Sequence, residues 1–166
     1  MGPIAEAQAI CLRLLTTRPR SRAELAEALR KRGVSEQVCQ PVLDRLGEVG
    51  LINDAVFAES VVHTGYRHRG LARWALRTEL RRRGVPDEIA DDAVAAVQLE
   101  DEEQRARELV RHKLRSSGTV RDPRMLIRRL AAMLVRKGYS EGLAMRVVRD
   151  ELGPGNWPAE VEFHPD

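Results

Sequence analysis

The residues best suited to chemistry in this sequence are arginines that recur at helical spacing. Arg73, Arg77 and Arg81 follow one another at intervals of four residues. That interval places them in one stripe along a helix of 3.6 residues per turn. A guanidinium group binds a phosphate or a carboxylate through two parallel hydrogen bonds. The stripe therefore predicts contact with a polyanion or with an acidic protein surface.

Further arginines extend this basic surface on both sides of the stripe and into a later segment. Glu79 is the only acidic residue between positions 63 and 84, so one sequence neighbour is available to neutralise the stripe. A solvated helix face remains the alternative for any single arginine, and basic residues in a last helical turn also stabilise the helix end. The candidate binding residues are Arg67, Arg69, Arg73, Arg77, Arg81, Arg124, Arg128 and Arg129.

Charge is segregated along the chain, although the net charge is only +3. Residues 105–149 contain thirteen Lys or Arg against three acidic residues. Residues 150–166 contain five acidic residues and neither Lys nor Arg. A basic body with an acidic tail is typical of a protein that faces a polyanion or an acidic partner.

The sequence lacks the motifs of common catalytic and metal-binding sites. His63 and His68 are five residues apart, a poor spacing for sharing a metal on a helix, and Cys11 and Cys39 form no CxxC pair. We therefore predict no enzymatic activity, no cofactor and reduced cysteines. No signal peptide or membrane-spanning run is evident, which predicts a cytoplasmic protein with no membrane partner.

Three segments of the chain repeat one pattern around a glycine. Gly33, Gly84 and Gly138 are separated by 51 and 54 residues, and two basic residues precede each. Leucines lie four and eight positions before every glycine, which indicates a helix with one buried face. Glycine suits the left-handed position that ends a helix, and Ser35 and Ser140 suit the start of the next. Trp74, on the middle copy, is expected to pack between repeats, and stacking on a nucleic-acid base is the alternative.

A further helix is predicted before each of these pairs, at about residues 4–16, 54–66 and 101–115. The chain is therefore predicted to be all-α, with three tandem three-helix repeats that form an elongated, curved body. The predicted domains are repeat 1 (1–52), repeat 2 (53–98), repeat 3 (99–153) and an acidic C-terminal tail (154–166).

Two stretches of the sequence resemble a known family. They are GLINDAVFAESVV (50–62) and RGLARWALRTELRRRGVPDEI (69–89), which are similar to the central signature of the RecX regulators of the RecA recombinase. The resemblance covers about residues 5 to 150, and Asn53 departs from the commoner Asp. The matching residues are Gly50, Asn53, Asp54, Phe57, Ala58, Arg69, Gly70, Glu79, Leu80, Gly84 and Val85.

The resemblance implies a monomeric, non-enzymatic protein of three three-helix repeats that binds the groove of the RecA–DNA filament. It further implies inhibition of RecA ATPase, strand exchange and co-protease activities, and so control of recombinational repair and the SOS response. The alternative is a stand-alone DNA-binding protein without sequence preference. The third helix of each repeat begins with acidic residues, which would repel phosphates and so disfavour the reading of base edges by that helix. A third reading is a helical scaffold that binds an acidic peptide.

Overall fold

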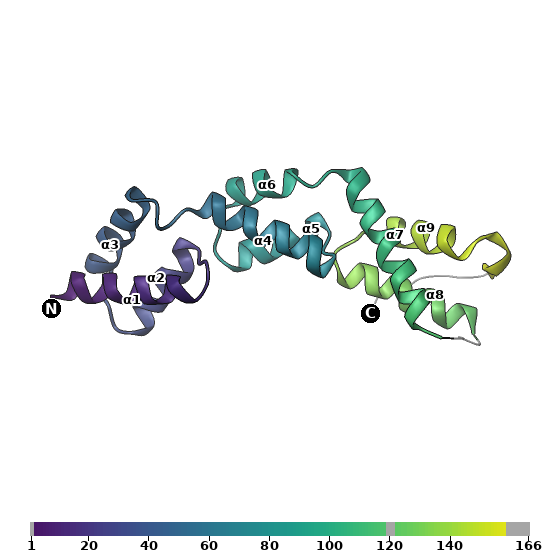
Figure 1. Ribbon diagram of the computed structural model, residues 1–166, viewed down its shortest axis with the longest axis horizontal. Coiled ribbons are helices and arrows are strands. Elements are labelled where there is room, and N and C mark those ends of the chain that lie inside the picture. The colour runs from purple at the N-terminus through teal and green to yellow at the C-terminus, as the bar shows by residue number, and fades with distance from the viewer. Residues whose placement is uncertain (1, 119–121, 159–166) are drawn as a thin grey trace. The chain divides into compact units, whose positions relative to one another are not determined.

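The computed structural model describes residues 2–118 and 122–158, and these residues form helices and no strands (Figure 1). The predicted all-α fold and the order of nine α-helices are confirmed over this part of the chain. The helices are α1 (Pro3–Thr17), α2 (Arg22–Lys31), α3 (Glu36–Glu48), α4 (Asp54–Arg69), α5 (Arg73–Arg82), α6 (Asp87–Ala95), α7 (Leu99–Ser116), α8 (Pro123–Arg136) and α9 (Glu141–Leu152), followed by the short 3₁₀ helix η1 (Pro154–Asn156).

Side-chain caps determine where several helices begin. Ser21 and Glu24 form a capping box at the start of α2, in which each side chain bonds the other residue's backbone amide. The Ser140 hydroxyl accepts a hydrogen bond from an amide in the first turn of α9, as predicted. Ser35 occupies the equivalent position before α3, but its side chain makes no capping bond. Asp122 caps α8 through its carboxylate.

The three repeated glycines end α2, α5 and α8 in the predicted way. Their φ angles are +79° for Gly33, +81° for Gly84 and +95° for Gly138. In each case the amide after the glycine donates to the carbonyl of the leucine four positions before it, at 3.0 to 3.1 Å. This is the bond of a Schellman helix end. The leucine therefore has two roles, since its side chain enters the core and its carbonyl fixes the turn.

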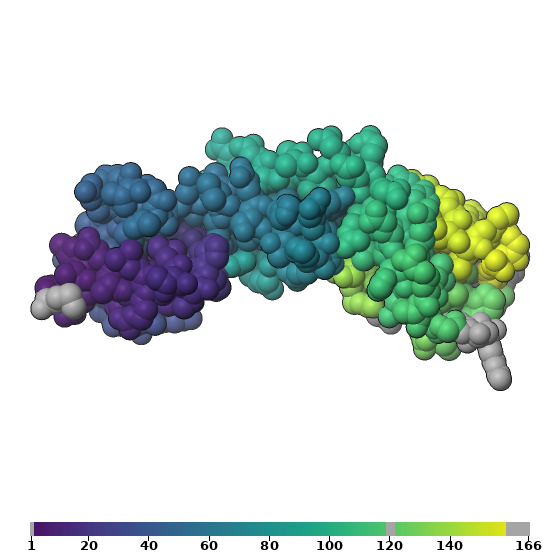
Figure 2. All heavy atoms as spheres, viewed as in Figure 1, coloured from purple at the N-terminus to yellow at the C-terminus, as the bar shows by residue number. Residues whose placement is uncertain are grey.

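The chain divides into two compact units. Unit 1 comprises Met1–Val62 with Arg77–Val94, and unit 2 comprises His63–Leu76 with Ala95–Asp166. Helices α4 and α5 contribute to both units, so repeat 2 is shared between them. In unit 2, α7 and α9 pack side by side (Figure 2).

Aliphatic side chains from all three helices contribute to the core of α1–α3 and to the core of α7–α9. The leucines four and eight positions before the repeated glycines are at most 1% exposed, as their spacing predicted. Cys11 and Cys39 are free, buried thiols within the core of α1–α3. The α7–α9 core is formed largely by α8 and α9, and Trp157 packs against its edge. Phe163, in the acidic tail, lies outside the described residues.

Candidate functional site

Two arginines of the predicted stripe form ion pairs with α6 inside unit 1. Arg77 Nε lies 2.5 Å from Asp91 Oδ1, and Arg81 Nε lies 3.0 Å from Asp87 Oδ1. The hydrogen bond from Arg77 holds the pKa of Asp91 below its usual range. The turn at Gly84 brings α6 back beside α5, so the carboxylates come from the next helix along the chain.

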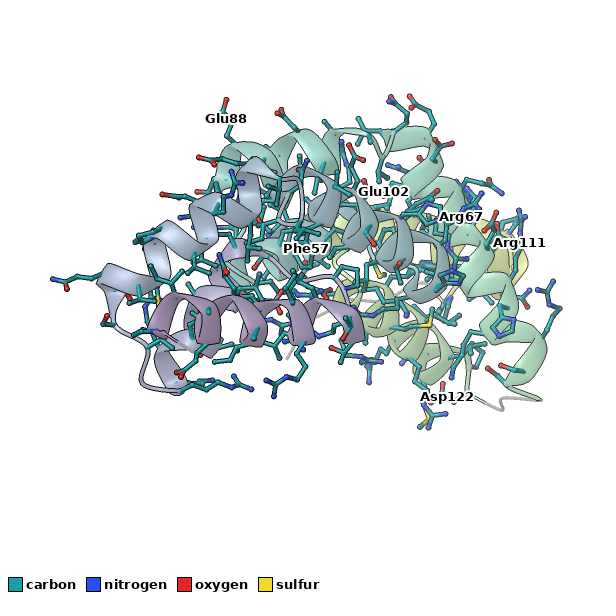
Figure 3. The ribbon with its side chains drawn as sticks, turned by 60° about the vertical axis from the view of Figure 1, so that its left-hand side comes forward. Phe57, Arg67, Glu88, Glu102, Arg111 and Asp122 are labelled. Atoms are coloured by element: carbon teal, nitrogen blue, oxygen red, sulfur yellow. The ribbon has the colours of Figure 1, made fainter. Side chains whose placement is uncertain are left out.

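The third arginine of the stripe has its partner in unit 2. Arg73 Nε donates to Glu102 Oε2 on α7 at 2.8 Å, and the Glu102 side chain is only 13% exposed. Figure 3 labels Glu102. These three carboxylates lie outside residues 63–84, where Glu79 is the only acidic residue. Each arginine is paired with a carboxylate that follows it by 6 to 29 residues in the sequence.

Arg67 and Arg69 are exposed residues at the C-terminal end of α4. Two cations from outside α4 donate hydrogen bonds to the backbone carbonyls of this helix end. Arg105 donates to the carbonyl oxygens of Tyr66 (3.2 Å) and Arg67 (3.0 Å). Lys137 Nζ donates to the Arg69 carbonyl at 2.7 Å. Cations in these positions stabilise the negative end of the helix dipole. All five residues belong to unit 2.

The environment of Lys137 indicates an excess of positive charge at this helix end. Burial lowers the pKa of Lys137, and the charges of Arg105, Arg69 and Arg136 lower it further. Each charged neighbour that shifts this pKa is a cation. An anion near this position would therefore be attracted by several charges at once.

Helix α8 carries three of the predicted basic residues. Arg124, Arg128 and Arg129 are exposed, and α8 contains no Asp or Glu. Within residues 2–118 and 122–158, no carboxylate pairs with these three side chains or with Arg136. We call Arg124, Arg128, Arg129 and Arg136 together the α8 basic face.

The helical spacing explains how this face is presented. Arg128, Arg129 and Arg136 lie within about one third of the helix circumference, on the side opposite the buried residues. Met125 shares that side and is 46% exposed. Sequence reasoning missed Arg136, although its spacing of seven residues from Arg129 was the available signal. The buried side of α8 consists of Ile127, Leu130, Ala131 and Leu134.

Arg107, Arg111 and Arg146 form an ion-pair network between α7 and α9. Arg107 contacts Glu103 at 2.8 Å and Asp150 at 3.0 Å. Arg111, which is labelled in Figure 3, makes a bidentate pair with Glu151 at 2.8 and 3.0 Å. Hydrogen bonds from Arg107 lower the pKa of Glu103. These arginines hold two helices of the same unit together, whereas the α8 basic face has no such role.

Residues of the 50–62 segment and the end of α5 connect to α2 in unit 1. The Asp54 carboxylate accepts a hydrogen bond from the first amide of α2 at 2.9 Å. The Arg83 guanidinium lies 4.6 Å from the centre of the buried Phe57 ring and 3.2 Å from Glu24. Its carbonyl accepts a 2.6 Å bond from the Ser21 hydroxyl. Arg83 is therefore a structural residue, and Figure 3 labels Phe57 among these packed side chains.

Trp74 is 69% exposed, and its packing between repeats stays a prediction. Among the residues that the structure describes, no group of three or more His, Cys, Asp or Glu is arranged to hold a metal ion. No described helix is both long enough and apolar enough to cross a membrane.

Family comparisons match this arrangement repeat by repeat. The models of the first, second and third three-helix domains of RecX match residues 7–46, 53–94 and 100–148. The chain belongs to the RecX family. The family resemblance in the sequence is thereby confirmed, and the matching models describe domains of a regulatory protein.

Relatives and solved structures of RecX cover most of the chain. Regulatory protein RecX of Streptomyces coelicolor is 55% identical over 151 residues, which are 90% of this chain and 79% of the relative. The protein of the same name from Thermobifida fusca is 51% identical over 159 residues, or 96% and 84% of the two chains. The crystal structure of RecX from Lactobacillus salivarius matches with a TM-score of 0.76 at 23% identity, covering 90% of this chain and 96% of the other. The latter match supports the fold.

Proposed function

We propose that this RecX-family chain binds RecA and its nucleoprotein filament in the cytoplasm and inhibits the recombinase, ATPase and co-protease activities. It acts by binding, without a catalytic step and without a cofactor. The relatives named regulatory protein RecX and the three matching domains support this role. Tuning of recombinational repair and of the SOS response follows from such inhibition.

The observation that carries the proposal is the α8 basic face. Its four guanidinium groups are exposed and have no carboxylate partner in the described part of the chain. Each group keeps its charge and its hydrogen-bond donors available for phosphates or carboxylates. A filament of protein on DNA offers both kinds of acceptor along its length.

The α5 stripe has a smaller part in this proposal. Arg77 and Asp91 have 38% and 54% exposed side chains, so water screens their pair and a polyanion could displace Asp91. Arg81 and its partner are more exposed still. Arg73 is held more firmly, because its partner Glu102 is largely buried. We therefore rank Arg77 and Arg81 as secondary contacts and Arg73 as structural.

The test is inhibition of RecA ATPase on single-stranded DNA, titrated with wild-type chain and with the double variant Arg128→Gln/Arg129→Gln. We expect wild type to inhibit at stoichiometric amounts and the variant to need about tenfold more, equivalent to 1.4 kcal/mol of binding free energy. The control is Arg13→Gln/Arg45→Gln on repeat 1, which removes the same charge from exposed positions and should inhibit like wild type.

Two outcomes of this titration have different meanings. If wild-type chain leaves ATPase and strand exchange unchanged, the proposed function is wrong. If wild type and the α8 variant inhibit equally, the function stands but the α8 basic face is not the contact surface.

The same α8 basic face also favours a second candidate, direct DNA binding without sequence preference. Binding of the chain alone to a DNA oligonucleotide, measured over a range of salt concentrations, separates the two. For B-DNA, each lost phosphate contact should reduce the slope of log K against log salt by about 0.9. An α8 variant with unchanged DNA affinity but weaker RecA inhibition would assign the face to protein contact.

A further inference from the structure

Repeat 1 contains a charged recess that the predicted arginine stripes do not include. It has a volume of about 310 Å³ and lies between the end of α1 and one side of α2. All of its lining belongs to unit 1. Four cations and two carboxylates line it, with Leu14 and Ala28 as its apolar contacts. The charged residues are Arg18, Arg20, Lys31, Arg32, Glu24 and Glu27.

Two of these cations are held by neutral groups. Arg20 Nε donates to the Leu14 carbonyl at 3.2 Å, and its Nη2 lies 3.3 Å from the Thr17 hydroxyl. Arg32 Nη1 donates to the Ala28 carbonyl at 3.2 Å. Neither guanidinium pairs with a carboxylate among the described residues. Capping of helix ends explains why they are held, but it uses only one or two of the five donors on each group.

The carboxylates of the recess are already committed to other cations. Glu24 accepts from Arg18 at 2.7 Å and pairs with Arg83 at 3.2 Å. Burial alone would raise the pKa of Glu24, but the hydrogen bond from Arg18 and the charge of Arg83 lower it overall. Glu27 pairs with Lys31 at 2.9 Å. The charges of Arg20 and Arg32 therefore remain uncompensated at the recess.

We propose that this recess is a phosphate-binding site, with Arg20 and Arg32 as its principal ligands and Lys31 at its rim. A phosphate offers several acceptor oxygens, which suits two guanidinium groups better than a single carboxylate would. Because backbone carbonyls hold both groups in place, less side-chain freedom is lost on binding. The volume exceeds that of a single phosphate and leaves space for an attached sugar or base. The site does not depend on the proposed function, which rests on α8.

The experiment compares inorganic phosphate, a thymidine mononucleotide and a short oligothymidylate as probes of the full chain. Binding is followed by isothermal titration for the small probes and by fluorescence anisotropy for the oligonucleotide. The variants are Arg20→Gln and Arg32→Gln, with Arg13→Gln as a control for loss of one exposed charge on α1. We expect each recess variant to weaken phosphate binding about tenfold, equivalent to 1.4 kcal/mol, and the control to match wild type.

The source of the phosphate is read from the same data. Tighter binding of the oligonucleotide, with a strong salt dependence, indicates a nucleic-acid backbone, whereas equal affinity for the mononucleotide indicates a free nucleotide. If Arg20→Gln loosens the end of α1, Arg32→Gln still tests the site. The Arg32 side chain makes only one hydrogen bond among the described residues, an exposed one to the Ala28 carbonyl, so its loss should not disturb the fold. The proposal is overturned if wild type binds none of the probes, or if Arg32→Gln binds them as wild type does. If the α8 variant no longer inhibits RecA but still binds phosphate at the recess, the proposed phosphate site stands.

Discussion

Replacing Gly84 with alanine should destabilise unit 1 far more than the same replacement of Gly33. Both glycines have the left-handed backbone, with φ of +81° and +79°. An alanine methyl group at position 84 would lie 2.3 Å from the Ala23 Cβ atom, whereas nothing lies within 4 Å of one at position 33. Gly33→Ala therefore measures backbone strain alone, and Gly84→Ala measures the same strain plus a collision.

The two costs can be separated from general magnitudes. A non-glycine residue in the left-handed region costs about 1–2 kcal/mol. Forcing an extra methyl group into a packed contact adds about 1–3 kcal/mol. We therefore expect losses in the free energy of unfolding of about 1–2 kcal/mol for Gly33→Ala and about 2–5 kcal/mol for Gly84→Ala. The measurement is urea unfolding followed by circular dichroism, compared at equal m-values.

A second substitution provides an internal check, because Ala23→Gly removes the atom that causes the collision. Alone, Ala23→Gly should cost up to about 1 kcal/mol for glycine in a helix. Combined with Gly84→Ala, it should restore about 1–3 kcal/mol of the free energy of unfolding that the collision removes. The double variant should therefore lose less stability than the two single variants added together. In unit 2, Ala75→Gly should rescue Gly138→Ala less well, since that methyl also lies 2.8 Å from the backbone nitrogen of Ala75.

The reasoning fails if Gly84→Ala and Gly33→Ala are equally destabilising, because the collision would then have no energetic effect. It also fails if Ala23→Gly adds its own cost to Gly84→Ala without any rescue. Either result would mean that the contact between α2 and the turn after α5 is not tightly packed.

Three further predictions concern single polar contacts. Tyr139→Phe should lower the free energy of unfolding by about 0.5–1.5 kcal/mol, because the buried Tyr139 hydroxyl donates to the Gly70 carbonyl at 2.9 Å. Glu103 has a lowered pKa when folded, so its stabilising effect is present above the unfolded pKa of about 4.3 and is lost as pH falls through the folded value. Glu103→Gln should therefore lose less stability than wild type when unfolding is measured between about pH 5 and pH 3. Asp91→Asn removes the partner of Arg77 and should strengthen DNA binding in fluorescence anisotropy, and an unchanged affinity would exclude Arg77 as a contact.

The fold was predictable because its determinants are local. The leucine four positions before each glycine and the residue after that glycine are five positions apart, and one hydrogen bond joins them in every copy. The spacing of the leucines, the helix face that they bury and the glycine that ends the helix all lie within about ten residues. Ser35 shows the limit of such reasoning. It occupies the expected position before α3, yet its side chain makes no bond there.

The site was only partly predictable, because the partners of the arginines come from other helices. Arg77 and Asp91 are 14 residues apart, and Arg73 and Glu102 are 29 apart. Counting charges within a short window therefore overestimated how free the α5 stripe is. The α8 residues differ, because the absence of any acidic residue from α8 is visible in the sequence itself. The recess of repeat 1 could not be predicted, since it needs the end of α1 to lie beside α2.

The repeated glycine turn has a second role that explains why basic residues precede it. In unit 1 the Arg83 carbonyl accepts a bond from Ser21, the residue before α2. In unit 2 the Lys137 carbonyl accepts a bond from Ala72, the residue before α5, at 2.9 Å. In both units the turn of one repeat therefore contacts the start of the middle helix of the preceding repeat. The side chains of Arg83 and Lys137 then reach groups beside that helix start, Glu24 and the Arg69 carbonyl. The basic residue before each of these two glycines thus joins neighbouring repeats, in addition to balancing the dipole of its own helix.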